Sequence, residues 1–204
     1  MELRQAIADL AEVRGRLATV QRFEGYSGWA AITSGLVAVA AGVVQFALIP
    51  APRTLADQRL YLDLWLTCLA LALAINYGAI VAWYVRHRSA HVDVQVRTVG
   101  MSIAPAVAAG GVITIALVSR GLYGLLPGMW CATYALGLFA SRAMVPRNVV
   151  AIAVAFGAFA AFLLLSVRID TMSWWVMPLA FGCGQIAIGA MVRTDDRSRA
   201  GVTP

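Results

Sequence analysis

The sequence predicts an all-α integral membrane protein: a polytopic bundle of six transmembrane helices, arranged as three hairpins, behind an N-terminal amphipathic cytoplasmic helix. Three observations predict this fold class. Six apolar segments are each about as long as the ~20 residues that a helix needs to cross a bilayer core. Hydrophobic residues make up 61% of the 204 residues and the mean hydropathy is +0.77, which excludes an ordinary soluble domain. The arginines are also distributed unevenly between the two sides of the predicted membrane.

The six apolar segments occupy most of the chain. They cover residues 28–49, 60–85, 99–119, 122–140, 149–167 and 174–192. We therefore expect one membrane domain over residues 28–192, with a cytoplasmic amphipathic helix over residues 1–27 and a disordered cytoplasmic tail over residues 193–204. The polar stretches that remain are too short for a soluble catalytic domain.

The charges predict the orientation. All 16 basic residues are arginine, and the net charge is +6. With a cytoplasmic N-terminus, twelve arginines lie inside and only Arg53, Arg59, Arg120 and Arg168 lie outside. This asymmetry follows the positive-inside rule, so both termini should be cytoplasmic. The basic character then reflects topology, and we expect no nucleic acid partner. Residues 1–22 are charged throughout, so no cleavable signal peptide is expected.

The N-terminal segment has the pattern of an amphipathic helix. Its apolar residues alternate three and four apart, at Leu3, Ala6, Leu10, Val13, Leu17 and Val20. Two interpretations stay open. The helix lies on the inner leaflet or docks on its own bundle, or it pairs with a second copy through a short heptad seam.

Small residues recur on one side of several spans. They are Ser34, Gly35, Ala38, Ala41 and Gly42 in the first span, Ala106, Gly110, Gly111 and Thr114 in the third, and Gly182, Gly184 and Gly189 in the sixth. Such residues let helix backbones approach closely in lipid. Tryptophans near span ends, including Trp29, Trp65 and Trp174, are expected in the aromatic belts.

Polar residues inside the spans are the default candidates for function. Gln45 and Asp63 could meet across the first hairpin, or Asp63 could be a solvated acid at the outer start of its helix. Deeper in the membrane, Asn76, Tyr134 and Gln185 could line one small polar cavity. The alternative is that they are interhelical hydrogen-bonding residues with a structural role.

The cytoplasmic side offers a second group of candidates. Arg22, Glu24 and Tyr26 precede the first span, and Arg142 and Arg147 flank the turn after the fourth. Together these side chains could bind an anionic lipid headgroup or an acidic partner. The competing interpretation is that the arginines only set the topology.

Motifs for catalysis and metal binding are missing from the sequence. It contains no P-loop, GxSxG, HExxH or dinucleotide-binding fingerprint. His87 and His91 have a spacing that can bind zinc, but solvated histidines are the simpler interpretation. Cys68, Cys131 and Cys183 lie in separate spans and suit packing roles. We expect no catalytic residues, no metal site and no cofactor.

Three stretches resemble a group of six-span bacterial inner-membrane proteins with no assigned activity. The stretches are RFEGYSG (Arg22–Gly28), LPGMWCATYALGLFASRAMVPR (Leu126–Arg147) and MPLAFGCGQIAIGA (Met177–Ala190). Matching positions are Arg22, Gly25, Tyr26, Pro127, Gly128, Trp130, Gly137, Arg142, Pro146, Arg147, Gly182, Gly184 and Gln185. This chain has GYSG where related chains tend to have GYGP. The resemblance implies the architecture and a bacterial inner-membrane location.

Taken together, the sequence favours a non-enzymatic accessory, scaffolding or sensing subunit that acts through its cytoplasmic helix and basic inner face. Expected partners are membrane lipids and either further copies of the chain or other subunits of a membrane complex. The main alternative is a small-molecule or ion transporter or channel with a polar pocket between the second, fourth and sixth spans. A lipid-modifying enzyme that uses Glu24 and the inner arginines is a third class.

Overall fold

The computed structural model describes residues 23, 25–87, 90–142, 146, 148–166 and 169–200, and within these residues it is helical with no strand. Residues 1–22 and 24 of the predicted amphipathic segment, which include Arg22 and Glu24, lie outside the described residues, and so does Arg147. Most of the predicted tail is described. There the last helix continues beyond residue 192 to Ala200.

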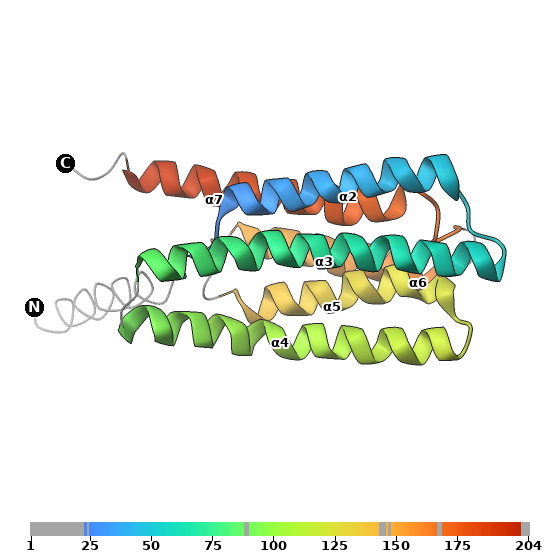
Figure 1. The fold of residues 1–204 in the computed structure, drawn as a ribbon, viewed down its shortest axis with the longest axis horizontal. Coiled ribbons are helices and arrows are strands. Elements are labelled where there is room, and N and C mark those ends of the chain that lie inside the picture. Colours follow the sequence, from blue (N-terminus) through green and yellow to red (C-terminus); the bar gives the residue numbers. More distant parts are fainter. Residues whose placement is uncertain are drawn as a thin grey trace, which may run out of the picture.

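Helices of different lengths lie side by side along one elongated bundle (Figure 1). They are α2 (Gly28–Leu48), α3 (Leu55–Arg86), α4 (Ala90–Ser119), the short 3₁₀ turn η1 (Tyr123–Leu125), α5 (Leu126–Ala140), α6 (Val149–Leu165), the π-helix η2 (Pro178–Cys183) and α7 (Gly184–Ala200). Three of these helices are long and apolar enough to cross a membrane: α2, α3 and the Val96–Ser119 part of α4. Helix α6 is apolar but shorter.

Local sequence explains where the helices start and stop. The Ser27 hydroxyl caps α2 by accepting a hydrogen bond from the Ala30 amide at 3.3 Å. Thr54 and Asp57 form a reciprocal capping box at the start of α3. The predicted tight turn after α4 occurs at Gly121, whose φ of 71° lies in the left-handed region that favours glycine. These residues define the starts of α2 and α3 and the turn after α4.

Helix α2 touches η2 and α7 along a series of glycines. Gly28 and Gly35 of α2 face Gly189 and Gly182, respectively. A Cβ atom at Gly35 would lie 2.8 Å from the Gly182 carbonyl oxygen, and one at Gly28 would lie 2.7 Å from the Gly189 carbonyl oxygen. Backbones at this separation leave no room for a side chain. We call this contact the glycine seam; it joins the first and last helices that the structure describes (Figure 1).

Helix α5 packs against α4 on one side and α6 on another. The Trp130 indole donates a hydrogen bond to the Thr114 hydroxyl of α4 at 2.8 Å. A Cβ atom at Gly128 would collide with Leu164 of α6, at 2.7 Å from Cγ. Helix α4 itself is peripheral: within the described part of its apolar segment, Val96–Ser119, no residue is buried. The packed interior therefore lies among α2, α3, α5, α6 and α7.

The glycine seam should tolerate no added side chain. We expect Gly35→Val to lower the free energy of unfolding by about 2 kcal/mol or more, because backbone atoms of η2 and α7 occupy the space. Gly78→Val on α3 is the matched control, since nothing lies within 4 Å of a Cβ atom there, and it should stay within about 0.5 kcal/mol of the wild type. Thermal unfolding in detergent, followed by circular dichroism, measures both. Equal stability of the two variants would contradict the seam.

Candidate functional site

A three-way polar junction lies at the end of the bundle where α2 ends, which we call the outer end because the predicted orientation places it outside. Gln45 is fully buried. Its side-chain amide donates to the Met172 carbonyl oxygen at 2.7 Å, and its side-chain oxygen accepts from the Trp65 indole at 2.8 Å. One glutamine thus links α2 to α3 and to the segment that precedes η2. We call Gln45, Trp65 and Met172 the outer junction.

The segment before η2 is held in place by further contacts. The Thr171 hydroxyl donates to the Gly124 carbonyl oxygen of η1. The Trp174 amide donates to the Pro50 carbonyl oxygen at 3.1 Å, and the Trp174 ring packs edge-on against Phe46 of α2, with 5.1 Å between ring centroids. Loops from distant parts of the chain therefore close the outer end together.

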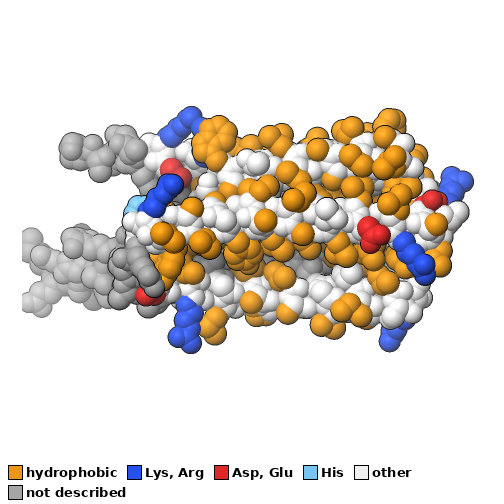
Figure 2. Space-filling view, in the orientation of Figure 1, with side chains coloured by type: hydrophobic (Ala, Val, Ile, Leu, Met, Phe, Trp, Pro, Cys, Tyr) orange, Lys and Arg blue, Asp and Glu red, His pale blue; other side chains and the backbone are white. Residues whose placement is uncertain are grey.

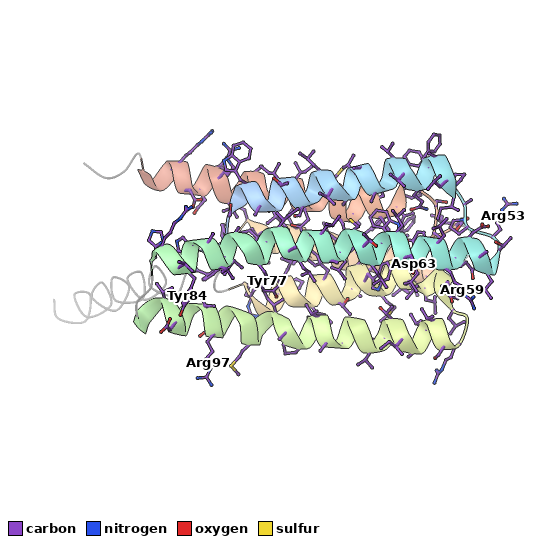
Figure 3. The ribbon with its side chains drawn as sticks, in the orientation of Figure 1. Arg53, Arg59, Asp63, Tyr77, Tyr84 and Arg97 are labelled. Carbon is purple, nitrogen blue, oxygen red and sulfur yellow. The ribbon has the colours of Figure 1, made fainter. Side chains whose placement is uncertain are left out.

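The structure decides between the two interpretations of Asp63 and corrects the expected position of Trp65. Gln45 pairs with Trp65 and Met172 instead of Asp63. Asp63 is exposed on α3 near its outer end (Figure 3), as the alternative interpretation had it. Trp65, expected in an aromatic belt, is only 3% exposed. Trp65 and Asp63 are two positions apart on one helix, so they point to different sides of α3.

A second polar pair lies deeper in the bundle. The side-chain amide of Gln185 on α7 donates to the Tyr134 hydroxyl of α5 at 2.7 Å. Rings of Phe156 and Phe181 enclose Tyr134, with centroids 4.7 and 5.4 Å from its own. The Gln185 side-chain oxygen is buried and has no hydrogen-bond partner among the described residues. The pair therefore joins α5 to α7 and leaves one acceptor unused.

Asn76, the third residue of the predicted cavity, is bonded within its own helix. Its side-chain amide donates to the Ala72 carbonyl oxygen of α3 at 2.8 Å. The structure thus brings together Tyr134 and Gln185 and gives Asn76 a local partner.

Tyr26 lies just before α2, at the end of the bundle that we call the inner end because the predicted orientation places it in the cytoplasm. It packs on a buried cluster of Val149, Ile188 and Val192. Tyr134 packs on the same cluster, so Tyr26 and the Tyr134–Gln185 pair are neighbours. Burial raises the pKa of Tyr26 to about 12. A tyrosine in this position is an uncharged packing residue at physiological pH.

The other inner-face candidates are dispersed or lie outside the described residues. Arg142 is exposed, and its guanidinium donates to the Phe139 carbonyl oxygen at 3.0 Å, so it caps the end of its own helix. Nearby on α3, Trp83 stacks on His87 and meets Phe23 edge-on, with centroids 5.4 and 5.5 Å apart. Arg22, Glu24 and Arg147 lie outside the described residues.

Sequence reasoning missed one further contact at the inner end. The Arg193 guanidinium carbon lies 3.7 Å from the centroid of the Trp29 ring. A cation–π pair of this kind needs α7 to continue past residue 192, and the sequence analysis ended the last span there. The sequence carries no signal for this contact, because it depends on the packing of α7 against Gly28 of α2.

Among the described histidine, cysteine and carboxylate side chains, no three lie together in a group that could hold a metal ion. Cys68 and Cys131 are buried, and Cys183 is exposed. None of the described polar clusters combines a nucleophile with a neighbouring base. The contacts of Gln45 with Trp65 and Met172, and of Gln185 with Tyr134, link different segments of the bundle.

Comparison with known proteins gives no family assignment. No protein-family model matches the chain, and no curated protein or solved structure matches it significantly. The resemblance to six-span inner-membrane proteins therefore stays a prediction.

Replacing Gln45 should test the outer junction. We expect Gln45→Met, which keeps the volume, to lower the free energy of unfolding by about 2 kcal/mol, because the Trp65 indole and the Met172 carbonyl lose their partner. Asp63→Asn, at an exposed position of α3, should change it by less than about 0.5 kcal/mol. Urea or thermal unfolding in detergent compares the two, and an unchanged Gln45→Met protein would refute the structural role of the junction.

The raised pKa of Tyr26 predicts a pH dependence. An unfolded chain loses this proton near pH 10, whereas the folded protein keeps it up to about pH 12. The protonated Tyr26 side chain therefore contributes its full share to the free energy of unfolding below pH 10. This contribution falls by about 2 kcal/mol in total as the pH rises to 12. The Tyr26→Phe variant lacks this decline, so the difference in unfolding free energy between wild type and variant should change across that range. If the unfolding free energies of wild type and Tyr26→Phe changed in parallel with pH, the burial of the Tyr26 hydroxyl would be contradicted.

Proposed function

We propose that this chain is a six-span protein of the bacterial inner membrane, with cytoplasmic termini, that serves as an accessory or scaffolding subunit. The observation that carries the proposal is that two glutamines within the spans link helices through hydrogen bonds of their side chains. Gln45 joins α2, α3 and the segment before η2, and Gln185 joins α7 to α5. Such contacts are typical of structural helix association in lipid.

The dimensions of the bundle support a membrane location. Trp29 at the inner end and Phe46 at the outer end are seventeen residues apart on α2, or about 26 Å along the helix axis, close to the ~30 Å of a bilayer core. Hydrophobic side chains cover the middle of the visible face, and charged ones gather at its two ends (Figure 2). This is the distribution that a lipid-facing bundle needs.

The course of the remaining helices supports six crossings. Helices α5 and α6, and η2 with α7, run along the same bundle as the three longer helices (Figure 1). Arg86, Arg97, Arg142 and Arg193 belong to the end of the bundle where α2 begins, and Arg53, Arg59 and Arg120 to the opposite end. With the first end in the cytoplasm, the described arginines still favour the inner side.

Helix α4 supports a role in assembly. Four small residues recur on one of its faces, Gly100, Ala104, Ala108 and Gly111, and all four are exposed. Nothing lies within 4 Å of a Cβ atom at Gly100 or Gly111. A neighbouring helix can approach closely where side chains are this small. A further copy of the chain or another membrane subunit would fit there, together with contacts made by the N-terminal helix.

The assembly role predicts that the N-terminal helix governs the oligomeric state. We expect deletion of residues 2–23 to convert a discrete oligomer, or a complex with a captured subunit, to a monomer, measured by native mass spectrometry of the detergent-purified protein. Deletion of residues 201–204 is the control and should leave the assembly intact. If the N-terminal deletion changes neither the oligomeric state nor the captured partners, the proposal fails.

The unused acceptor of Gln185 favours one second candidate, a transporter or channel with a pocket beside Tyr134. An unpaired buried acceptor is costly, and a bound polar solute would satisfy it. This candidate requires solute flux in liposomes that is lost in Gln185→Ala, whereas the scaffold proposal expects no flux in either protein.

A further inference from the structure

The inner end of the glycine seam carries an exposed cation–π pair. Arg193 of α7 lies over the Trp29 ring of α2, with 3.7 Å between its guanidinium carbon and the ring centroid. Trp29 is 61% exposed, and Arg193 is partly buried. We call Trp29 and Arg193 the inner pair.

The contact between α2 and α7 at the glycine seam positions Arg193 next to Trp29. A Cβ atom at Gly28 would lie 2.6 Å from Cγ of Arg193, so the aliphatic stem of the arginine occupies the space that the glycine leaves. The stem crosses the first turn of α2 at this point, and the guanidinium then reaches the neighbouring indole. Because both helices fix the stem, the position of the charge is set by the backbone contact.

The N–H groups of the Arg193 guanidinium can donate hydrogen bonds to a ligand. One face of the Arg193 guanidinium lies on the indole of Trp29. The five N–H groups of a guanidinium point outward in its plane, so stacking on a ring leaves them available. Planar pairs of N–H donors match the oxygens of a phosphate.

The surroundings indicate a lipid as the source of that phosphate. With the orientation proposed above, Trp29 lies at the cytoplasmic edge of the membrane, where indoles sit among the headgroups. Leu36 and Val43 follow Trp29 at seven-residue intervals on the same face of α2 and are 55% and 63% exposed. An acyl chain that extends from a phosphate at Arg193 toward the bilayer centre would cover these two side chains.

We propose that Trp29 and Arg193 form a binding site for the phosphate group of a phospholipid in the cytoplasmic leaflet. The ring fixes the plane of the guanidinium, the guanidinium binds the phosphate oxygens, and the exposed face of α2 contacts an acyl chain. This inference rests on the membrane orientation of the proposed function, and it is independent of the assembly role.

Lipid binding to matched variants tests the site. The full-length protein in detergent is titrated with dioleoyl phosphatidylglycerol, and the fraction carrying one lipid is measured by native mass spectrometry. We expect Arg193→Gln to weaken binding about tenfold, the scale of a charge-assisted hydrogen bond. Arg197→Gln is the control, because Arg197 is exposed one turn further along the same helix and its replacement removes the same charge. This variant should change lipid binding less than about twofold.

Two further variants distinguish a loss of lipid binding at this site from a loss caused by misfolding. Arg193→Lys keeps the charge and loses the planar fork, and it should weaken binding several-fold while the protein melts as wild type. Trp29→Leu should also weaken binding, because the guanidinium loses the ring that orients it.

If Arg193→Gln and Arg197→Gln weakened lipid binding equally, the proposed site would be contradicted, because only the net charge of the protein would then matter. Displacement of the lipid by inorganic phosphate at the same concentration would contradict it as well, because it would indicate a site for the free ion. Neither result bears on the N-terminal deletion, whose effect on the oligomeric state tests the scaffold proposal separately.

Discussion

The close approach of α2 to η2 and α7 is the constraint on which the rest of the structure depends. Lipid supplies no hydrophobic drive between helices, so association relies on van der Waals contact between well-matched surfaces. Gly28 against Gly189 and Gly35 against Gly182 provide that contact at backbone distance. The seam closes the bundle by joining its first and last described helices. It also positions both ends: the outer junction forms where α2 leaves the seam, and the inner pair forms where α7 leaves it.

Satisfaction of polar groups is the second constraint, because an unbonded donor or acceptor inside a membrane costs several kcal/mol. Gln45 meets this requirement fully, with both ends of its side chain bonded across three segments. Gln185 meets it in part, since its amide nitrogen is bonded and its buried oxygen is not. The outer junction therefore has a structural role. At the Tyr134–Gln185 pair, the buried Gln185 oxygen could still accept a hydrogen bond from a solute.

Much of this arrangement could be predicted from the sequence, because length, hydropathy and small-residue spacing act locally along each helix. The apolar segments, the turn at Gly121 and the small face of α2 follow from such patterns. The partner of Gln45 could not be predicted, because it depends on how α3 is rotated: Trp65 turns inward and Asp63 turns outward. The inner pair was missed for a similar reason. A charged stretch after residue 192 resembles a tail, and only packing against α2 shows that the helix continues through Arg193.

Cross-linking in the native membrane tests the central claim, the contact between α2 and α7, most directly. A cysteine-free protein would carry Trp29→Cys with Arg193→Cys and a protease site in the loop after α5, and would be treated with a short thiol-reactive linker. The seam predicts that the two halves stay joined after cleavage. They should separate when Trp29→Cys is instead combined with Leu165→Cys, which lies in the C-terminal half at the opposite end of the bundle, at the end of α6. Separation of the halves in the first combination, or equal joining in both, would contradict the account.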